Sequence, residues 1–315
     1  SNLIQGIGGE GLNAFTAYDV TCYMNSFPSY QMERWLTLYA DRLTNPVFRS
    51  FQAELENVFE EYNMYLDDNS THTRNFIFGK LYEGHAYARD IIGYPEDLKN
   101  PKMRQLIDFY NTWYVPNNMA LILVGDFDTE AAKPLIEKTF GKLQARPLPQ
   151  RTQYPTTAFS QDERYSAKLG YMPELYIAYN GVPVGDKDEL LLDFLGEILS
   201  NSMQIGLLDE LTLDNKLMYA GAMNDIRRDQ GRFIVVAVPY MDAETQTYTS
   251  LKETENLVNE AIQQLVNGNI SEELVEAVRQ NFYQEFDRTM EYPAMKVQLL
   301  QNAFTYQQSI EEMLL

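Results

Sequence analysis

Hydrophobic residues repeat with helical spacing in several long stretches of the chain and alternate with polar residues in a few short ones. Helical spacing predicts helices at residues 31–41, 54–65, 73–82, 101–113, 130–140, 188–199, 205–212, 251–267 and 271–290, with Pro101 in the first turn of its helix. Alternation and short apolar runs predict strands at residues 13–25, 119–126, 174–180, 219–226 and 232–239. The predicted fold class is therefore α+β, with helices packed on a mainly antiparallel sheet.

The same order of elements occurs on both sides of a proline-rich stretch. Residues 144–157 place three prolines among Arg, Gln and Thr, a composition typical of a linker. We therefore predict a first domain over residues 1–145, a linker over 146–158 and a second, similar α/β sandwich unit over 159–315.

Both ends of the chain fall inside a repeating pattern. A periodic stretch begins at Leu3 with no initiator Met before it, and residues 306–315 stop within an amphipathic pattern with no closing strand. We therefore expect both units to be cut short, so that the chain is a fragment of a longer protein.

The charge balance and the apolar runs exclude some classes of partner. The chain has 25 Lys and Arg against 45 Asp and Glu, a net charge of −20, and no basic cluster that could neutralise phosphates, so nucleic acid is not expected as a partner. Cys22 is the one cysteine, which excludes an internal disulfide and a Cys-rich zinc site. No apolar run is long enough to span a bilayer, so we expect a soluble protein. The sequence leaves its compartment open, with the periplasm and the cytoplasm as the alternatives.

Candidate chemistry is concentrated in the predicted helix at residues 54–65. Glu54 and Glu61 are seven residues apart, about two turns at about 3.6 residues per turn, so both carboxylates leave nearly one face of the helix. A separate apolar stripe would bury the helix and fix their orientation; it consists of Leu55, Val58, Phe59 and Tyr62. Such a pair suits a metal, although the pattern alone is more typical of a solvated charged face.

Five short strings occur in the order and spacing of one known family. They are GGEGLNAFT with DVTCY (residues 8–23), RLTNPVF (42–48), the helix at 54–65, GHAY with IIG (84–93), and YVPNNM with VGD (114–126). In these strings the chain resembles the M16 metallopeptidases, the group of pitrilysin, insulysin and mitochondrial processing peptidase. The resemblance covers the first 145 residues and continues more faintly to the end.

The resemblance implies a zinc ligand in this chain. In the family, zinc is held by the two His of an inverted His-x-x-Glu-His motif and by a Glu on a downstream helix, with another acidic residue seven positions before that Glu. The zinc ligand maps onto Glu61 and its outer partner onto Glu54; Glu60 points about 100° away round the helix.

The His-x-x-Glu-His motif itself is absent from the chain. In the family it lies upstream of the glycine turn, so two zinc ligands and the catalytic base are expected in a preceding segment. The chain alone is then expected to be inactive and not to bind zinc tightly. The two histidines present, His72 and His85, are not predicted as substitute ligands.

The resemblance also implies a place for substrate. Family members bind peptides by adding a strand to an exposed sheet edge, which here maps onto Asn13, Ala14, Phe15 and Thr16. The alternative is an ordinary strand packed internally.

A second substrate contact of the family is incomplete in this chain. Family members carry an Arg and a Tyr seven residues apart, and here Tyr219 occupies the Tyr position while Thr212 stands in place of Arg. Because a hydroxyl cannot form the charge-assisted fork of a guanidinium, the functional Arg and Tyr are expected in another half, with Tyr219 in the core or a cleft wall.

The sequence therefore predicts part of a zinc metalloendopeptidase that hydrolyses peptides in an enclosed chamber. A second M16-like half, in the same chain or in a partner subunit, would close that chamber. The alternatives are a non-catalytic M16-like scaffold subunit and a helix-rich adaptor unrelated to proteolysis. Acidity carried into the chamber would favour basic or unstructured peptides, and surface solubility explains it equally well.

Overall fold

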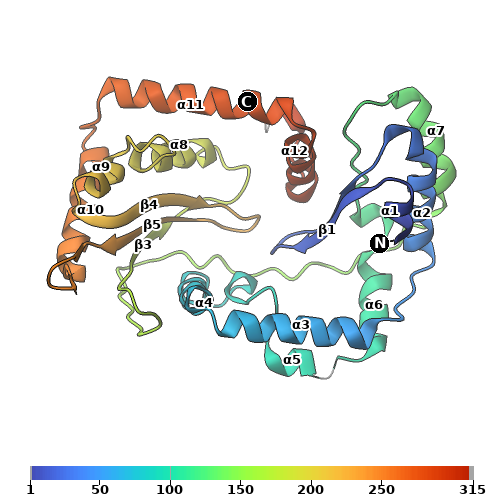
Figure 1. Cartoon of the computed structure of the whole chain (residues 1–315), viewed down its shortest axis with the longest axis horizontal. Helices are drawn as coiled ribbons and strands as arrows, with labels where there is room; N and C mark the ends of the chain where they lie inside the picture. Colours follow the sequence, from blue (N-terminus) through green and yellow to red (C-terminus); the bar gives the residue numbers. More distant parts are fainter. Residues whose placement is uncertain (1, 100, 312–315) are drawn as a thin grey trace. The chain divides into compact units, whose positions relative to one another are not determined.

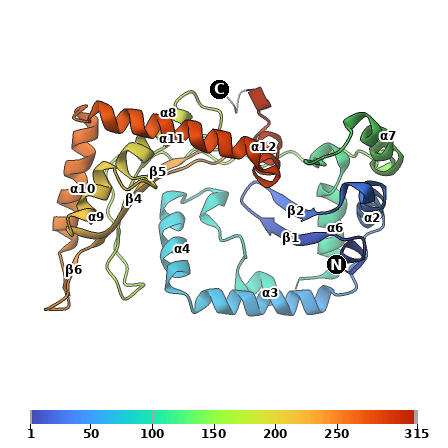
Figure 2. The same cartoon turned by 45° about the horizontal axis from the view of Figure 1, so that its top comes forward.

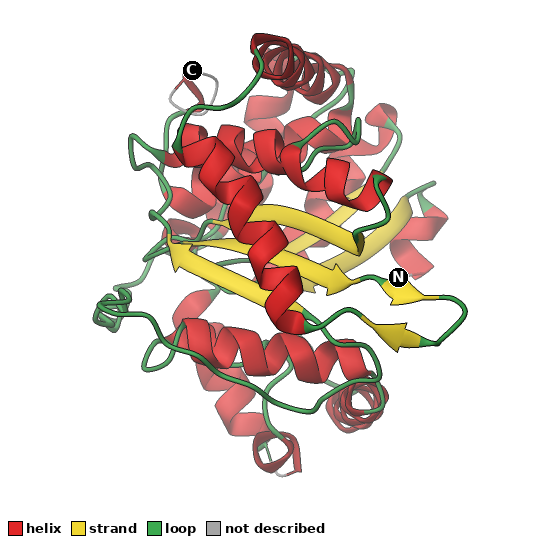
Figure 3. Ribbon diagram, turned by 90° about the vertical axis from the view of Figure 1, so that its left-hand side faces the viewer, coloured by secondary structure: helices red, strands yellow, loops and turns green. Residues whose placement is uncertain are grey.

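The computed structural model describes residues 2–99 and 101–311, which divide into two compact units (Figure 1). Unit 1 comprises Ser1–Asp67, Asp90–Gln153 and Tyr292–Leu315, and unit 2 comprises Asp68–Arg89 and Tyr154–Glu291. Both units contain helices and antiparallel strands (Figure 3), so the predicted α+β class is confirmed. No helix among the described residues is long and apolar enough to cross a membrane.

Unit 1 contains a hairpin and a set of helices. Its elements are α1 Asn2–Gly6, β1 Glu10–Thr16, β2 Thr21–Ser26, α2 Met32–Thr44, α3 Phe51–Leu66, α5 Pro95–Lys99, α6 Met103–Trp113, α7 Thr129–Thr139 and α12 Pro293–Tyr306. The core of this unit lies between α2 and α7, where Trp35 and Leu36 pack against Ala132. Trp35 also stacks between two rings, with centroid distances of 4.7 Å to Phe27 and 4.3 Å to Tyr39.

Unit 2 is built on a three-stranded antiparallel sheet with the order β3-β5-β4. Its elements are α4 Asn69–Leu81, β3 Leu175–Asn180, α8 Glu189–Leu199, α9 Leu207–Leu213, β4 Leu217–Asp225, β5 Arg232–Pro239, β6 Met241–Asp242, β7 Thr247–Tyr248, α10 Leu251–Val266 and α11 Glu272–Glu291. Every residue of the central strand β5 is buried. The strands and helices predicted in this half of the chain are confirmed to within a few residues at each end.

The two faces of this sheet are covered by different helices. Successive residues of a strand point to opposite faces. Phe233, Val235 and Ala237 accordingly join the core formed with α8, α9, α10 and α11, whereas Ile234 joins a second cluster with Leu81 and Tyr82. Figures 1 and 2 show α8 and α11 on one side of the sheet and α4 on the other.

A buried arginine holds α4 and the segment after it to the sheet. The Arg232 side chain is 1% exposed, and its Nε and Nη2 atoms donate to the carbonyl oxygen of Leu81 at 3.1 and 2.9 Å. It also donates to the carbonyl oxygens of Gly231 and Thr157 and lies over the rings of Tyr82 and Phe159. Carbonyl groups and aromatic faces thus solvate this charge in place of water.

A second arginine, Arg227, also contributes to the packing of α4 on the sheet. Arg227 forms an ion pair with Asp225, with 2.9 Å between Nη2 and Oδ2, and its guanidinium lies 4.3 Å from the centre of the Tyr82 ring. The Tyr82 hydroxyl donates to Asp225 Oδ2 at 2.5 Å, and burial followed by the neighbouring carboxylate raises the pKa of Tyr82 strongly. These groups join α4 to β4 across a long sequence separation.

Two sequence-based expectations about this fold are wrong. Residues 119–126 are not a strand, because no strand in the described ranges pairs with them, although Leu121 and Leu123 do pack against the unit 1 core. A strand requires a hydrogen-bonded neighbour as well as an apolar sequence.

Pro101 is not in a first helical turn, because α6 begins at Met103 with Lys102 as its N-cap. The predicted pattern at 306–315 lies partly outside the described residues.

Three carboxylates on one face of α8 make the stability of unit 2 dependent on pH. Glu189, Asp193 and Glu197 follow one another at four-residue spacing, and burial raises the pKa of each carboxyl. For Glu197, the charges of Asp209 and Glu285 raise the pKa further, and its buried Oε2 accepts no hydrogen bond from the residues that the structure describes. The folded state therefore disfavours a charge on Glu197.

We expect the Glu197→Gln variant to be more stable than the wild type at neutral pH, by on the order of 0.5 kcal/mol. A carboxyl whose pKa is higher in the folded than in the unfolded chain binds more protons when folded, so wild-type stability falls as pH rises from 4.5 through the folded pKa. The stability of the variant should fall less than that of the wild type over the same pH range. Urea denaturation at a series of pH values measures this difference, and an unchanged pH dependence in the variant would contradict the raised pKa of Glu197.

Candidate functional site

The helix that carries Glu54 and Glu61 forms as predicted. Helix α3 spans Phe51–Leu66 and ends at Asp67, whose backbone N–H closes the last turn onto the carbonyl oxygens of Met64 and Tyr65. The predicted stripe of Leu55, Val58, Phe59 and Tyr62 is partly buried, and α3 lies against α5 (Figure 1). Glu54 and Glu61 are both exposed, and at about 100° per residue they lie beside the apolar stripe rather than opposite it.

The carboxylate of Glu61 is held by a tyrosine one turn further along α3. The Tyr65 hydroxyl donates to Glu61 Oε1 at 3.2 Å, a bond that restricts the rotamers of the glutamate. Sequence analysis missed Tyr65, although its i+4 spacing from Glu61 was the available signal. Glu54 lies in the first turn of the helix, where a negative charge is favoured by the helix dipole.

Glu61 suits zinc as one ligand, but the described part of the chain does not form a zinc site by itself. A catalytic zinc site has three protein ligands and an open position. Residues 2–99 and 101–311 contain no group of three His, Cys, Asp or Glu side chains that could hold a metal ion. The structure thus offers one positioned carboxylate, that of Glu61.

Both histidines, His72 and His85, lie in unit 2. His85 is 5% exposed; its Nδ1 accepts a hydrogen bond from the Tyr87 N–H at 3.1 Å, and its Nε2 lies 3.5 Å from Asp229 Oδ2. The acceptor role of Nδ1 places the proton of a neutral imidazole on Nε2, facing the carboxylate. His72 lies in the first turn of α4.

Strand β1 has an open edge. It pairs with β2 in antiparallel register, with Asn13 opposite Met24 and Thr16 opposite Thr21, and this sheet has two strands in the part of the chain that the structure describes (Figure 2). All seven residues of β1 are exposed, including Phe15 at 40%. The four residues predicted to contact substrate therefore lie on an accessible strand rather than in a packed interior.

Tyr219 lies on the surface of unit 2. It pairs with Val238 at the edge strand β4 and is 53% exposed, so it is not a core residue. Its ring covers Gly221 so closely that a Cβ on that glycine would lie 2.7 Å from the tyrosine Oη. Thr212 is partly buried on α9.

Comparison with known proteins gives the family. Residues 102–282 match the family described as the Peptidase M16 inactive domain. The probable zinc protease PqqL of Escherichia coli is 30% identical over 158 residues, which are 48% of this chain and 17% of the relative. The zinc protease PqqE of Helicobacter pylori is 23% identical over 246 residues, 75% of this chain and 54% of the relative.

Solved structures show the same fold. A protease from Helicobacter pylori matches with a TM-score of 0.83 at 18% identity, covering 99% of this chain and 79% of that one. A peptidase M16 inactive domain from Pseudomonas fluorescens matches with a TM-score of 0.80 at 16% identity, covering 99% and 74%.

The fold is therefore that of the M16-like proteases. The chain belongs to the M16 peptidase family, as its resemblance to that family predicts. It spans about half of PqqE and a smaller share of PqqL, both of which are named zinc proteases.

Proposed function

We propose that this chain is part of a zinc-dependent metalloendopeptidase, in which Glu61 is a zinc ligand and Glu54 orients the groups around it. The observation that carries this proposal is the helix α3. Two exposed carboxylates stand seven residues apart on it, beside an apolar stripe that is partly buried. Membership of a peptidase family with relatives named zinc proteases supports reading this pair as metal chemistry rather than as a solvated helix face.

The remaining groups of the active site would come from a preceding segment of the longer protein. That segment would carry His-x-x-Glu-His, and bound zinc would acidify a water molecule for attack on the peptide. Glu61 would contribute a carboxylate oxygen, with the Tyr65 hydroxyl restricting its rotamer. On this proposal residues 1–145 and 159–315 are two domains joined at 146–158, both extending beyond the chain, and the chain alone is inactive.

The open edge of β1 would bind the peptide substrate. Main-chain hydrogen bonds to an added strand give affinity with little dependence on side chains, which suits a peptidase that accepts many sequences. Within Asn13, Ala14, Phe15 and Thr16, the alternate residues whose backbone groups face away from β2 would supply those bonds. Tyr219 would contact substrate from its exposed position. A second M16-like half would close the chamber around the peptide.

We expect an Ala14→Pro change in the complete protein to raise KM for peptide by about tenfold, because it removes a backbone donor from the edge. The Ala14 N–H donates to the neighbouring Asn13 Oδ1 at 2.9 Å, so an incoming strand can take it over. Ala14→Ser keeps the N–H and is the matched control. Steady-state kinetics on an unstructured peptide decide the matter, and equal KM values for the two variants would remove β1 from the substrate site.

The test of the proposed function is peptide hydrolysis by a protein extended upstream through the missing segment. We expect the extended protein to cleave unstructured peptides and to lose this activity with a zinc chelator, and this chain to be inactive alone. A chelator-insensitive or inactive protein that is still correctly folded with its second half would contradict the proposal.

A non-catalytic scaffold subunit is the second candidate, favoured by the description of the matching family region as an inactive domain. An upstream segment with a degraded His-x-x-Glu-His motif would establish it. The presence of both Glu54 and Glu61 counts against it, because a subunit that binds no zinc gains nothing from that pair.

A further inference from the structure

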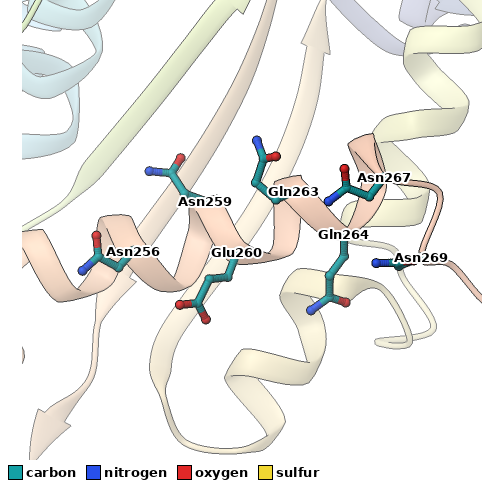
Figure 4. A pocket seen from close by; sticks show the side chains of 7 residues that line it. All are labelled: Asn256, Asn259, Glu260, Gln263, Gln264, Asn267 and Asn269. Carbon is teal, nitrogen blue, oxygen red and sulfur yellow. The ribbon is translucent and has the colours of Figure 1, made fainter.

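One face of α10 and the turn after it consists almost entirely of amide side chains. A depression of about 510 Å³ lies along this face (Figure 4). It is lined by Asn256, Asn259, Glu260, Gln263, Gln264, Asn267 and Asn269. In a chain with a net charge of −20, this surface carries a single carboxylate. A change that adds a negative charge here would therefore make this nearly neutral surface acidic.

Asn267 is followed by glycine, and the sequence contains one other such pair, Asn180-Gly181. An asparagine before glycine is chemically labile, because the glycine has no Cβ to keep its backbone nitrogen away from the asparagine side chain. The two pairs have the same local sequence chemistry. Their structural surroundings differ, so the fold decides which one reacts.

The Asn267-Gly268 pair is open. Asn267 is the exposed C-cap of α10, and no described residue donates to or accepts from its side chain in the hydrogen bonds of the structure. Gly268 has φ +69° with no atom within 4 Å of a Cβ position. Its N–H donates to the Leu265 carbonyl oxygen at 3.1 Å, a bond of the last helical turn, where helices fray.

The Asn180-Gly181 pair is held at both residues. The Asn180 side chain accepts from the Phe159 N–H at 2.8 Å and donates to the Phe159 carbonyl oxygen at 3.1 Å, so both of its polar atoms are engaged. The Gly181 N–H donates to the Gly231 carbonyl oxygen at 3.1 Å, and a Cβ on Gly181 would lie 2.7 Å from the Arg232 nitrogen. This pair ends the strand β3 beside the buried arginine.

We propose that Asn267 is a site of spontaneous deamidation in the folded protein and that Asn180 is protected from it. The backbone nitrogen of Gly268, after losing its proton, attacks Cγ of Asn267. The bond from Cγ to the side-chain nitrogen breaks, ammonia leaves and a cyclic imide remains. Water then hydrolyses the imide at either carbonyl, giving aspartate or isoaspartate. Each product has one free carboxylate in place of the neutral amide; in aspartate it is the side-chain group, and in isoaspartate it is the former main-chain carbonyl group.

The product places a negative charge at an unfavourable position. The C-terminus of a helix carries a partial negative charge, so a carboxylate there is repelled. Glu260 lines the same depression. Deamidation would therefore loosen the last turn of α10 and convert a nearly neutral amide surface into an acidic one, without affecting the sheet beneath it.

Peptide mapping by mass spectrometry after incubation of the purified protein in mildly alkaline buffer tests this proposal. We expect conversion at Asn267 to be at least about tenfold faster than at Asn180, because a helix end frays readily whereas the Asn180 side chain and the Gly181 N–H are both held by hydrogen bonds. In urea both sites should react at similar rates, which shows that the fold causes the difference.

Two variants complete the experiment. Gly268→Ala should slow the reaction at residue 267 strongly and leave Asn180 unchanged, whereas Asn180→Asp should leave Asn267 as reactive as before. Equal rates at the two sites in the folded protein, or no reaction at Asn267 while both sites react in urea, would overturn the proposal.

Discussion

Replacing Glu61 with glutamine is expected to lower peptide hydrolysis by the complete protein at least about 100-fold, since removal of partners outside the ligand shell already costs about 10–100-fold. Glutamine has nearly the same size and keeps an oxygen acceptor for the Tyr65 hydroxyl, which lies 3.2 Å from Glu61 Oε1. It lacks the negative charge that a carboxylate ligand brings to zinc. The loss should therefore appear with no change in the folding of α3.

Two other glutamates on the same helix, Glu60 and Glu54, provide comparisons for that experiment. Glu60→Gln removes an equal charge from a position about 100° round the helix and should leave the rate nearly unchanged. Glu54→Gln should cost about tenfold, the effect expected for an orienting group. If Glu60→Gln lowered the rate as much as Glu61→Gln, the net charge of α3 and not a ligand at Glu61 would explain the loss.

Replacing Arg232 with methionine is expected to destabilise the protein by about 3–5 kcal/mol, because several buried carbonyl oxygens would lose their donor at about 1–3 kcal/mol each. The methionine chain has a similar length and apolar character, yet it leaves the carbonyl oxygens of Leu81, Gly231 and Thr157 without the donors that they have now. Their desolvation is then uncompensated. Urea denaturation, followed by circular dichroism, measures the loss.

An exposed arginine of the same unit provides the comparison for Arg232. Arg279 on α11 pairs with Glu276 at 2.6 Å in solvent, and Arg279→Met should change stability by less than about 1 kcal/mol. Similar losses for the two variants would mean that the carbonyl contacts of Arg232 do not hold α4 to the sheet.

Local patterns predicted the elements of this chain well where one face of an element is buried. The apolar stripe of α3 has the helical period, and the continuous apolar run of β5 has the short length and β-branched residues of a buried strand; both elements were predicted. Residues 119–126 show the limit of this reasoning, since an apolar run becomes a strand only beside a partner. Helix α12 was missed because its apolar residues fall on all sides and give no stripe.

Contacts between distant parts of the chain could not be predicted from such patterns. Nothing around Arg232 in the sequence indicates that its guanidinium binds the carbonyl of Leu81, because that contact joins residues far apart in the chain. In the candidate site, the direction of Glu54 and Glu61 followed from helical geometry, whereas their role came from resemblance to a family. The Tyr65 hydrogen bond needed the structure, although the i+4 spacing allowed it.

The most direct test of the account is the amount of zinc bound per chain by the upstream-extended protein, compared with its Glu61→Gln and Glu60→Gln variants. We predict about one zinc ion per chain in the extended protein and in Glu60→Gln, and a large loss in Glu61→Gln, as expected for a three-ligand site that has lost one ligand. Full zinc occupancy in Glu61→Gln, or no zinc in the folded extended protein, would contradict the assignment of Glu61 as a ligand.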